Sequence, residues 1–397
     1  MTAFKIFSVR GIPIRIHVTF LLVLPFLAFV FANVVGMAAQ AAGVPPQGVT
    51  GAAWIWGLLL AFALFASVLL HELAHALYAV HKGGEVKDIV LMMIGGVSRL
   101  ERPPARPRDE AIMAAAGPLT SLLIGGVCLG VWALLGGLGP SATDGGDGLF
   151  SLRFGIFYLG QLNLFLGVFN LLPAFPMDGG RIVRSALQGR LGKVRATHVA
   201  GSLGKGFAVL FGMLGLFSGN FLLVIVALFV FMGAEGERRS VVVEDALEGL
   251  TVRDLMSDPV SPLSPHATAE DIIRRMQFER RTALPVGDGM GGVEGVVTLD
   301  IVRRVPEAMR LQKRARELAA KVTPLGVDEE AWAGVKKLYG SRASQLPVVE
   351  NGFVVGVLRQ QDVQRTMELR QLDKRAASRG DKRERRPLGW GPREREA

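Results

Sequence analysis

Six long apolar segments lie in the first 236 residues, and they constrain the fold more than any other feature of the chain. They cover about 18–38, 53–80, 109–136, 154–174, 198–217 and 219–236. Each is near the ~20 residues that an α-helix needs to cross a bilayer. The mean hydropathy is +0.35, which is not the profile of an ordinary soluble domain. We therefore predict a mainly α membrane protein with six transmembrane helices over residues 1–236.

Basic residues gather in alternate connections between these segments. Residues 81–108 and 179–197 are rich in Lys and Arg, and the N-terminus carries Lys5, Arg10 and Arg15, whereas 39–52 has no charged residue. Cytoplasmic loops carry the excess of basic residues, so we predict a multi-pass cell-membrane protein with both termini in the cytoplasm. The net charge of +10 then reports topology, and we predict no nucleic-acid partner.

The residues after the last apolar segment mix charged and apolar side chains, as soluble domains do. Residues 237–250 form the expected linker to this second module. Residues 373–397 are basic and poor in apolar groups, so a disordered tail is expected there. Such a tail could contact anionic lipid headgroups or simply be solvated, and the sequence leaves both open.

The second apolar segment contains His71-Glu72-Leu73-Ala74-His75. Residues i and i+4 share one face of a helix, so both imidazoles can bind the same metal ion. Glu72 is then close enough to act as a general base toward a water molecule on the metal. Ionisable residues are costly in hydrocarbon, which favours a functional site. The alternative is a pair of structural histidines in the core.

Asp178 follows the fourth apolar segment, which runs in the same direction as the second in the predicted topology. It should therefore lie at a similar depth to His71 and His75, as a third zinc ligand. Pro173 and Pro176 interrupt the helix there, which a membrane tolerates only where the backbone is buried in protein or lines a cavity. The alternative is a simple turn at Asp-Gly-Gly.

Two stretches outside the apolar segments have the pattern of short β-strands. Residues 8–17 alternate apolar and polar side chains, and 85–94 is strand-like and is followed by Gly95-Gly96. The second strand could offer an edge to an extended substrate. It could also form a hairpin packed against 8–17, and the two interpretations are compatible.

The motif at His71–His75 and the segment Asn170–Arg181 resemble those of the site-2 protease family of intramembrane zinc metalloproteases. The resemblance covers roughly residues 1–236, and Gly117–Ser121 is similar to the family's Gly-Pro motif, with Ser121 where Asn is common. We interpret that segment as a helix-packing or substrate-positioning element. The resemblance implies a catalytic core formed by spans two to four.

The same resemblance implies a site and a reaction. One Zn²⁺ per chain would be held by His71, His75 and Asp178, with Glu72 as the general base. The substrate would be a membrane protein, cleaved in a transmembrane or membrane-adjacent segment near the cytoplasmic side. A transporter or channel gated by the soluble module, and an inactive membrane scaffold, are the alternatives from other functional classes.

The soluble module contains an internal repeat of about 62 residues. Thr282–Val286 matches Ser344–Val348 in character, which indicates two similar units packed together. The repeat resembles a tandem pair of CBS (cystathionine-β-synthase-type) domains, over 251–306 and 319–372. The resemblance implies an α+β fold and a regulatory or dimerisation role, including homodimerisation of the protein.

CBS pairs often bind adenine nucleotides through a hydroxyl and an Asp after the last strand. The candidate residues are Thr298, Asp300 and Asp362. Both copies depart from the pattern, because only one residue separates Thr298 from Asp300, and Arg359 stands where Thr or Ser is usual. Nucleotide binding and a purely structural or dimerising role both remain open.

Overall fold

The computed structural model describes most of the chain, which forms two compact units. The described residues are 3–41, 46–93, 95–102, 104, 106–135, 148–258, 260–289, 292–341, 343 and 345–380. The first unit covers Met1–Val241 and the second covers Val242–Ala397. Each unit contains its own clusters of buried apolar residues.

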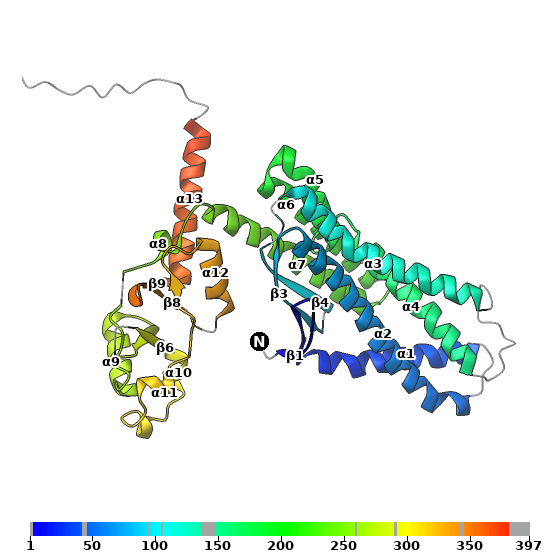
Figure 1. Ribbon diagram of the computed structural model, residues 1–397, viewed down its shortest axis with the longest axis horizontal. Helices are drawn as coiled ribbons and strands as arrows, with labels where there is room; N and C mark the ends of the chain where they lie inside the picture. Colours follow the sequence, from blue (N-terminus) through cyan, green and yellow to red (C-terminus); the bar gives the residue numbers. More distant parts are fainter. Residues whose placement is uncertain are drawn as a thin grey trace, which may run out of the picture. The chain divides into compact units, whose positions relative to one another are not determined.

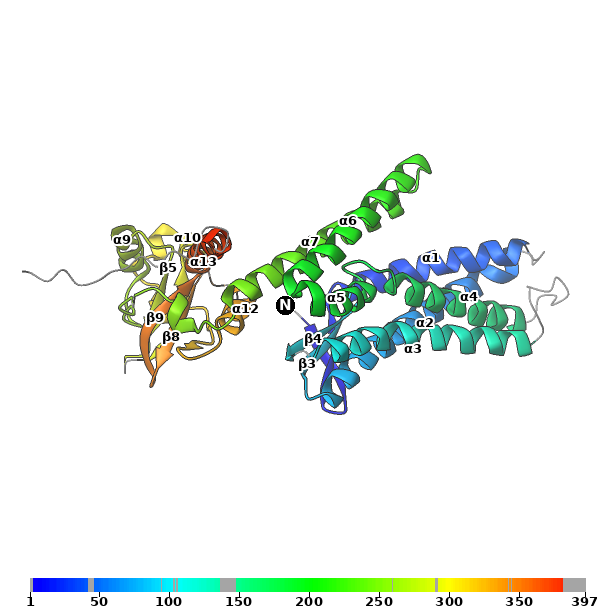
Figure 2. The same ribbon diagram turned by 90° about the horizontal axis from the view of Figure 1, so that it is seen from above.

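The first unit consists mainly of long helices (Figure 1). Among the described residues, five helices are long and apolar enough to cross a membrane. They are α1 (Phe20–Ala41), α2 (Pro46–His81), α3 (Pro107–Leu134), α4 (Gly148–Asn170) and α6 (Lys193–Phe217). Helix α1 packs on α2, and α3 packs on both α2 and α4 (Figure 2). These helices agree with the first five predicted spans.

The sixth predicted span, 219–236, lies in helix α7 (Phe221–Leu247), which is not among the five candidates. The apolar part of α7 ends at Ala234, and Glu235, Glu237 and Arg238 follow in the same helix. These charges leave an uncharged stretch shorter than the ~20 residues that cross a bilayer. By length and composition, the described residues therefore contain five candidate spans.

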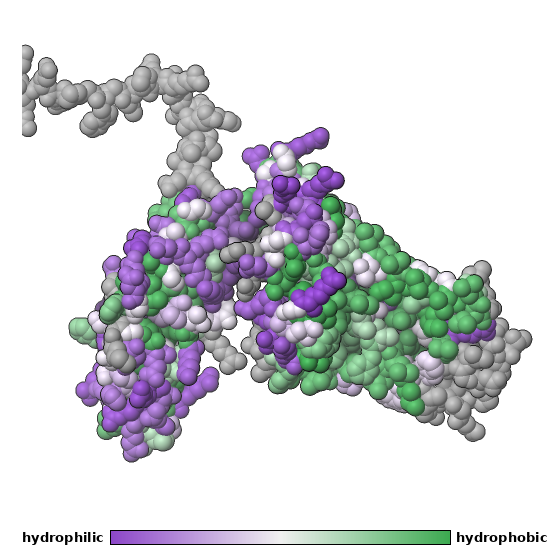
Figure 3. Space-filling model, viewed as in Figure 1, coloured by the Kyte–Doolittle hydropathy of each residue, from purple (hydrophilic) through white to green (hydrophobic). Residues whose placement is uncertain are grey.

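The surface of the helical unit is suited to lipid. Figure 3 shows hydrophobic residues over most of its visible face, with hydrophilic residues gathered at one end. Large apolar side chains are well exposed, such as Leu22 at 70%, Phe165 at 67% and Phe217 at 84%. A soluble monomer rarely exposes an apolar surface this extensive, so the unit is a multi-pass membrane domain.

A four-stranded sheet accompanies the helices, in the order β1-β2-β3-β4. Its strands are β1 (Ala3–Val9), β2 (Ile12–His17), β3 (Glu85–Met92) and β4 (Gly95–Arg102). The β1–β2 and β3–β4 pairs are antiparallel hairpins, and β2 runs parallel to β3. The single strand predicted over 8–17 is therefore wrong, because the chain turns at Arg10 and Gly11, which both have positive φ. The predicted packing of the second hairpin against this region is confirmed.

Strand β4 forms one edge of this sheet. Its register on β3 is reinforced by Asp88, which is only 2% exposed. The Arg99 guanidinium donates to Asp88 with Nε at 2.6 Å, and Arg15 Nε of β2 lies 3.1 Å from the same carboxylate. A buried carboxylate must be paired, so this triad ties three strands together.

A non-helical segment joins α4 to helix α5 (Asp178–Leu191). Helix α4 ends at Asn170, before the predicted end of span four, and α5 lies in what was predicted to be a connection. Two glycines of neighbouring helices, which have no side chain, allow those helices to pack closely against this segment. A Cβ at Gly204 of α6 would lie 2.1 Å from the Phe175 carbonyl oxygen, and one at Gly233 of α7 would lie 2.6 Å from Pro176 Cγ. The segment is thus enclosed by protein, as its exposed backbone groups require.

The second unit is α+β and contains two similar halves. The first half has α8 (Val252–Leu255), α9 (Ala269–Glu279), β5 (Ala283–Gly287), β6 (Val293–Thr298), α10 (Leu299–Arg303), the 3₁₀ helix η1 (Glu307–Met309) and α11 (Ala315–Leu318). The second has β7 (Leu325–Gly326), α12 (Ala331–Gly340), β8 (Gln345–Glu350), β9 (Phe353–Arg359) and α13 (Gln360–Gly380). The antiparallel pairs β5–β6 and β8–β9 correspond to the predicted repeat.

A buried hydrogen bond joins the two halves. The Gln345 side chain donates to the Ala283 carbonyl at 2.9 Å, joining the two strand pairs.

Helix α13 continues to Gly380, so the first eight residues of the predicted disordered tail, 373–380, are helical. Residues 381–397 lie outside the described part. Good helix formers such as Lys, Arg and Ala in this stretch favour the extension.

Candidate metal centre

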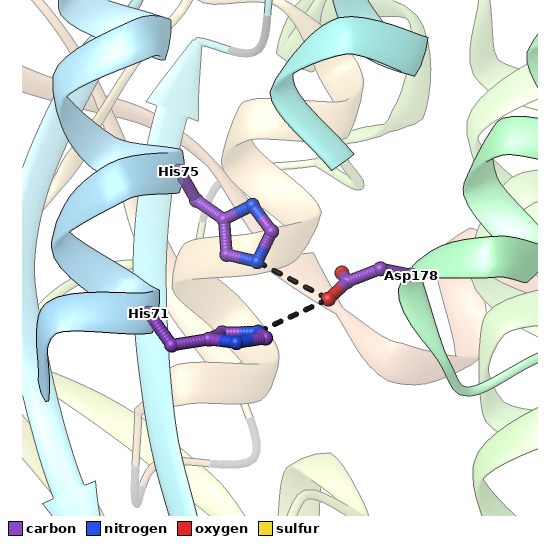
Figure 4. A group of neighbouring side chains, drawn as sticks. All are labelled: His71, His75 and Asp178. Carbon is purple, nitrogen blue, oxygen red and sulfur yellow. Dashed lines mark hydrogen bonds and ion pairs between the residues drawn. The ribbon is translucent and has the colours of Figure 1, made fainter. Parts of the chain in front are cut away.

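His71 and His75 lie one turn apart on the same face of α2, as their spacing predicts. Both are buried, at 5% and 8% exposure, and their ring centroids are 4.9 Å apart. Figure 4 shows both rings pointing toward one side chain, that of Asp178 at the start of α5. Two imidazoles of α2 therefore meet the carboxylate of Asp178, which lies 107 residues after His71 and 103 after His75 in the sequence.

The three side chains converge on one small space. Asp178 Oδ2 lies 3.3 Å from His71 Nε2 and 3.2 Å from His75 Nε2. One ligand atom from each of the three residues lies within 4.8 Å of the other two. Such a set suits a single ion that accepts nitrogen and oxygen ligands, with a further position left for a water molecule.

Helix α3 supplies the second layer of contacts. Its residues Met113, Gly117 and Ser121 are spaced by four, so they form one stripe along the helix. The Met113 carbonyl oxygen lies 2.6 Å from His75 Nδ1, and Ser121 Oγ lies 2.9 Å from His71 Nδ1. A carbonyl can only accept, so His75 donates from Nδ1, which leaves Nε2, the atom that faces Asp178, as the nitrogen that can bind a metal ion. This is the tautomer that a metal ligand requires.

Gly117 lies directly beneath the two ligand nitrogens. A Cβ there would be 2.2 Å from His75 Nε2 and 2.6 Å from His71 Nε2. A side chain at this position would fill the space between the rings. The two Nε2 atoms, the carboxylate oxygen between them and the space that Gly117 leaves open all fit a bound Zn²⁺. We predicted a packing or substrate-positioning element at Gly117–Ser121, and the contact of Gly117 with both Nε2 atoms gives this segment a more specific place beside the candidate metal site.

Glu72 lies beside the cluster but is not one of its three members. Its Oε2 accepts hydrogen bonds from Ser98 of β4, from the hydroxyl at 2.7 Å and from the backbone N–H at 3.0 Å. Sequence reasoning did not single out Ser98. The only signal was its place two residues after Gly95-Gly96, in a strand expected near the site.

Two ion pairs hold α5, the helix that begins with Asp178. Arg184, buried at 8% exposure, pairs with Glu110 of α3, and Arg181 lies 3.3 Å from Glu237 of α7. Charge pairs within a low-dielectric region are strong only with good geometry, but losing one partner is costly. They therefore orient the first turn of α5 relative to α3 and α7.

The nucleotide candidates occupy matching places in the two halves of the second unit. Thr298 and Asp300 lie at the start of α10, directly after β6, and Asp300 is exposed. Asp362 lies at the start of α13, directly after β9, where both of its oxygens are engaged. Oδ1 accepts from Ser257 at 2.7 Å, and Oδ2 accepts from Arg359 Nε at 3.0 Å. Thr298 and Asp300 lie within the same turn at the start of α10, whereas the carboxylate of Asp362 is already hydrogen-bonded to Ser257 and Arg359.

The fold and the cluster together define a multi-pass membrane protein with a candidate site for one metal ion. The model of peptidase family M50 matches residues 59–151 and 147–213, and that of the CBS domain matches 252–307. The chain is 30% identical to the zinc metalloprotease MJ0392 of Methanocaldococcus jannaschii, over 93% of this chain and 97% of that protein. It is 31% identical to the putative zinc metalloprotease Rip3 of Mycobacterium tuberculosis, over 80% and 82%.

Among solved structures, the site-2 protease from Methanocaldococcus jannaschii is 34% identical and covers 59% of this chain and 95% of that one, with a TM-score of 0.41. The chain thus belongs to peptidase family M50, the site-2 protease family of zinc metalloproteases, and carries a C-terminal CBS domain. The predicted enzyme class and family are confirmed.

Proposed function

We propose that this intramembrane metalloprotease cleaves transmembrane or membrane-adjacent segments of membrane proteins near the cytoplasmic side. In this proposal His71, His75 and Asp178 hold the zinc ion, and Glu72 is the general base. The observation that carries it is the convergence of two Nε2 atoms and one carboxylate oxygen over Gly117. The anchoring of both Nδ1 atoms on α3 supports it further.

The chemistry follows from where these residues lie. Zinc, when bound, acidifies a water molecule and polarises the peptide carbonyl. Glu72, next to His71 on the same turn of α2, accepts the proton of the attacking water and passes it to the leaving nitrogen. Oε1 of Glu72 has no hydrogen-bond partner among the described residues, which leaves that oxygen for proton transfer.

The substrate needs an extended conformation, because the peptide bonds of a helix are shielded. Strand β4 is an edge of the sheet, and it contacts the Glu72 side chain through Gly96 and Ser98. An unwound segment that adds to this edge would gain backbone hydrogen bonds and lie beside the base. The sequence pattern suggested an edge at 85–94, but that stretch forms the inner strand β3, and the edge is the following strand β4.

We also propose six membrane spans, with α7 as the sixth and both termini in the cytoplasm. The apolar first part of α7 and its glycine contact with Pro176 support this placement. The uncharged part of α7 is shorter than a full crossing, so the charged residues from Glu235 onward then lie within the interfacial region, where Glu235 pairs with Lys205 and Arg238. The orientation is inferred from the alternation of basic and non-basic connections along the sequence.

The soluble module is proposed to be a tandem CBS pair with a regulatory or dimerising role. The family model covers the first copy, and the strand pair β8–β9 with α12 and α13 repeats its arrangement. An adenine nucleotide would bind on the Thr298 and Asp300 side. The Asp362 side is disfavoured, because Arg359 and Ser257 already use its carboxylate.

The test is cleavage of a panel of single-span membrane peptides in proteoliposomes. Glu72→Gln keeps the size of the side chain but cannot accept a proton, so it should retain zinc and lose cleavage by about 10²–10⁴-fold. His71→Ala should lose both zinc and cleavage. Cleavage by Glu72→Gln at the wild-type rate would refute the base assignment. Zinc-free protein that still captures and protects a partner would favour a scaffold instead.

A further inference from the structure

Ser98 is the residue that holds the Glu72 carboxylate. Its hydroxyl is 2.7 Å and its backbone N–H is 3.0 Å from the same oxygen, Glu72 Oε2. The hydroxyl also lies 3.2 Å from the Glu72 carbonyl oxygen. Hydrogen bonds to a charged group are about twice as strong as neutral ones. Two of them on one oxygen restrict the carboxylate to one orientation and leave Oε1 free of protein partners among the described residues.

The position of Ser98 is itself fixed by the sheet. Ser98 pairs with Ile89 in the register of β3 and β4, and the next pair along is Asp88 with Arg99. The buried Asp88 carboxylate binds Arg99 on one side and Arg15 on the other. Strand β4 therefore cannot slide without breaking a buried charge pair. The N–H of Ser98 points to Glu72 because β4 is an edge strand there.

Gly96 completes the contact. A Cβ at Gly96 would lie 2.5 Å from Glu72 Cγ, so the base side chain packs directly on the backbone of β4. Gly96 and Ser98 of β4 both contact Glu72. They are two positions apart and so lie on the same side of the strand. Strand β4 therefore fixes the orientation of the Glu72 carboxylate, although Glu72 itself belongs to helix α2.

We infer that Ser98 is a positioning residue for proteolysis, which anchors Oε2 of the general base so that Oε1 is the oxygen that transfers the proton. This inference rests on the proposed function. It also means that the strand whose edge is proposed to hold the substrate is the strand that anchors the carboxylate of the base. A substrate segment seated on β4 is then held in a fixed position relative to Glu72.

The experiment measures kcat and KM separately for Ser98→Ala, Ser98→Thr and a matched control. Ser98→Ala keeps the N–H but removes the stronger hydroxyl bond, so kcat should fall about ten- to a hundredfold while KM stays within about threefold. Ser98→Thr keeps the hydroxyl and should recover most of kcat. Ser8→Ala, on the exposed opposite edge strand β1, should leave both constants unchanged.

A double-mutant cycle tests whether Ser98 acts through Glu72. The shorter side chain of Glu72→Asp cannot keep the Ser98 contact, so adding Ser98→Ala to it should change kcat less than about threefold. An unchanged kcat in Ser98→Ala, an equal loss in the Glu72→Asp background, or loss of bound zinc from Ser98→Ala would each overturn the inference. No cleavage by the wild-type protein would overturn the proposed function as well.

Discussion

Gly117 allows a sharp test of the metal centre, because one methyl group should close it. In Gly117→Ala the new Cβ would lie 2.2 Å from His75 Nε2 and 2.6 Å from His71 Nε2. The optimum separation of such atoms is about 3.5–4.0 Å, so each ring would have to retreat by about an ångström. The rings cannot move away freely, because their Nδ1 atoms are hydrogen-bonded to Met113 and Ser121 of α3, the helix that contains Gly117.

The consequence for zinc can be estimated from these distances. Zn–N bonds are about 2.0–2.1 Å and tolerate deviations of only ~0.2 Å. A displacement of about an ångström in either ring removes it as a good ligand. We therefore expect the zinc Kd to rise at least about a hundredfold, or roughly 2.7 kcal/mol. The overpacking itself should cost about 1–3 kcal/mol of stability.

The assay is zinc content after dialysis, with competition against a chelator of known affinity, alongside thermal unfolding of the detergent-solubilised protein. Gly126→Ala is the matched control, since Gly126 is in the same helix α3 and a Cβ there meets nothing within 4 Å. The control should bind zinc as the wild type does and unfold at the same or a slightly higher temperature. Wild-type zinc affinity in a folded Gly117→Ala protein would show that the site beside Gly117 does not bind the metal as proposed.

Two further predictions concern the soluble module. Titration calorimetry with ATP should show at most one site per chain, weakened by Asp300→Ala and unchanged by Asp362→Ala; the reverse pattern would refute the assignment. Hydrogen bonds from Thr268, from its side chain and then its backbone, lower the pKa of Asp271 below 3.8, so this cap stabilises α9 fully above that pH and less as the pH falls through the lowered value. Because Asp271 is exposed, Asp271→Asn should weaken α9 by only about 0.3–0.5 kcal/mol at pH 6 and remove this acid dependence, as hydrogen exchange of the α9 amides in the full chain can measure.

The sequence predicted the parts of the site that follow from periodicity. The i, i+4 spacing places His71 and His75 on one face of α2, and their depth relative to Asp178 follows from counting spans. The spans themselves are predictable because each is a long uncharged stretch. The turn within 8–17 was missed although Arg10-Gly11 carried a turn signal, since the alternating pattern extends through it.

Other parts of the site have little or no sequence signal. The Met113 contact uses a backbone carbonyl, which any residue carries. Helix α5 was missed because Gly179 and Gly180 are poor helix formers, and close packing against the 171–177 segment outweighs that preference. A Cβ at Gly179 would lie 2.2 Å from the Leu172 carbonyl oxygen, so only glycine permits the helix to begin there. Asp178 is thereby placed in the first helical turn and not in a loop.

The metal centre depends on how α3 packs on α4, because Met113 and Ser121 of α3 contact the Nδ1 atoms of the two histidines. Met113, Gly117 and Ser121 serve the site only in one register, because a slide of one residue moves them ~1.5 Å along the axis. At 2.6 and 2.9 Å the two contacts to Nδ1 have no room for such a shift. The register is set further along α3, where Leu164 of α4 packs on Gly125 and Leu122 of α3 packs on Gly167 of α4, with no room for a Cβ at either glycine. Small residues between α3 and α4, which touch no ligand of the metal, are therefore part of what keeps the imidazoles in place.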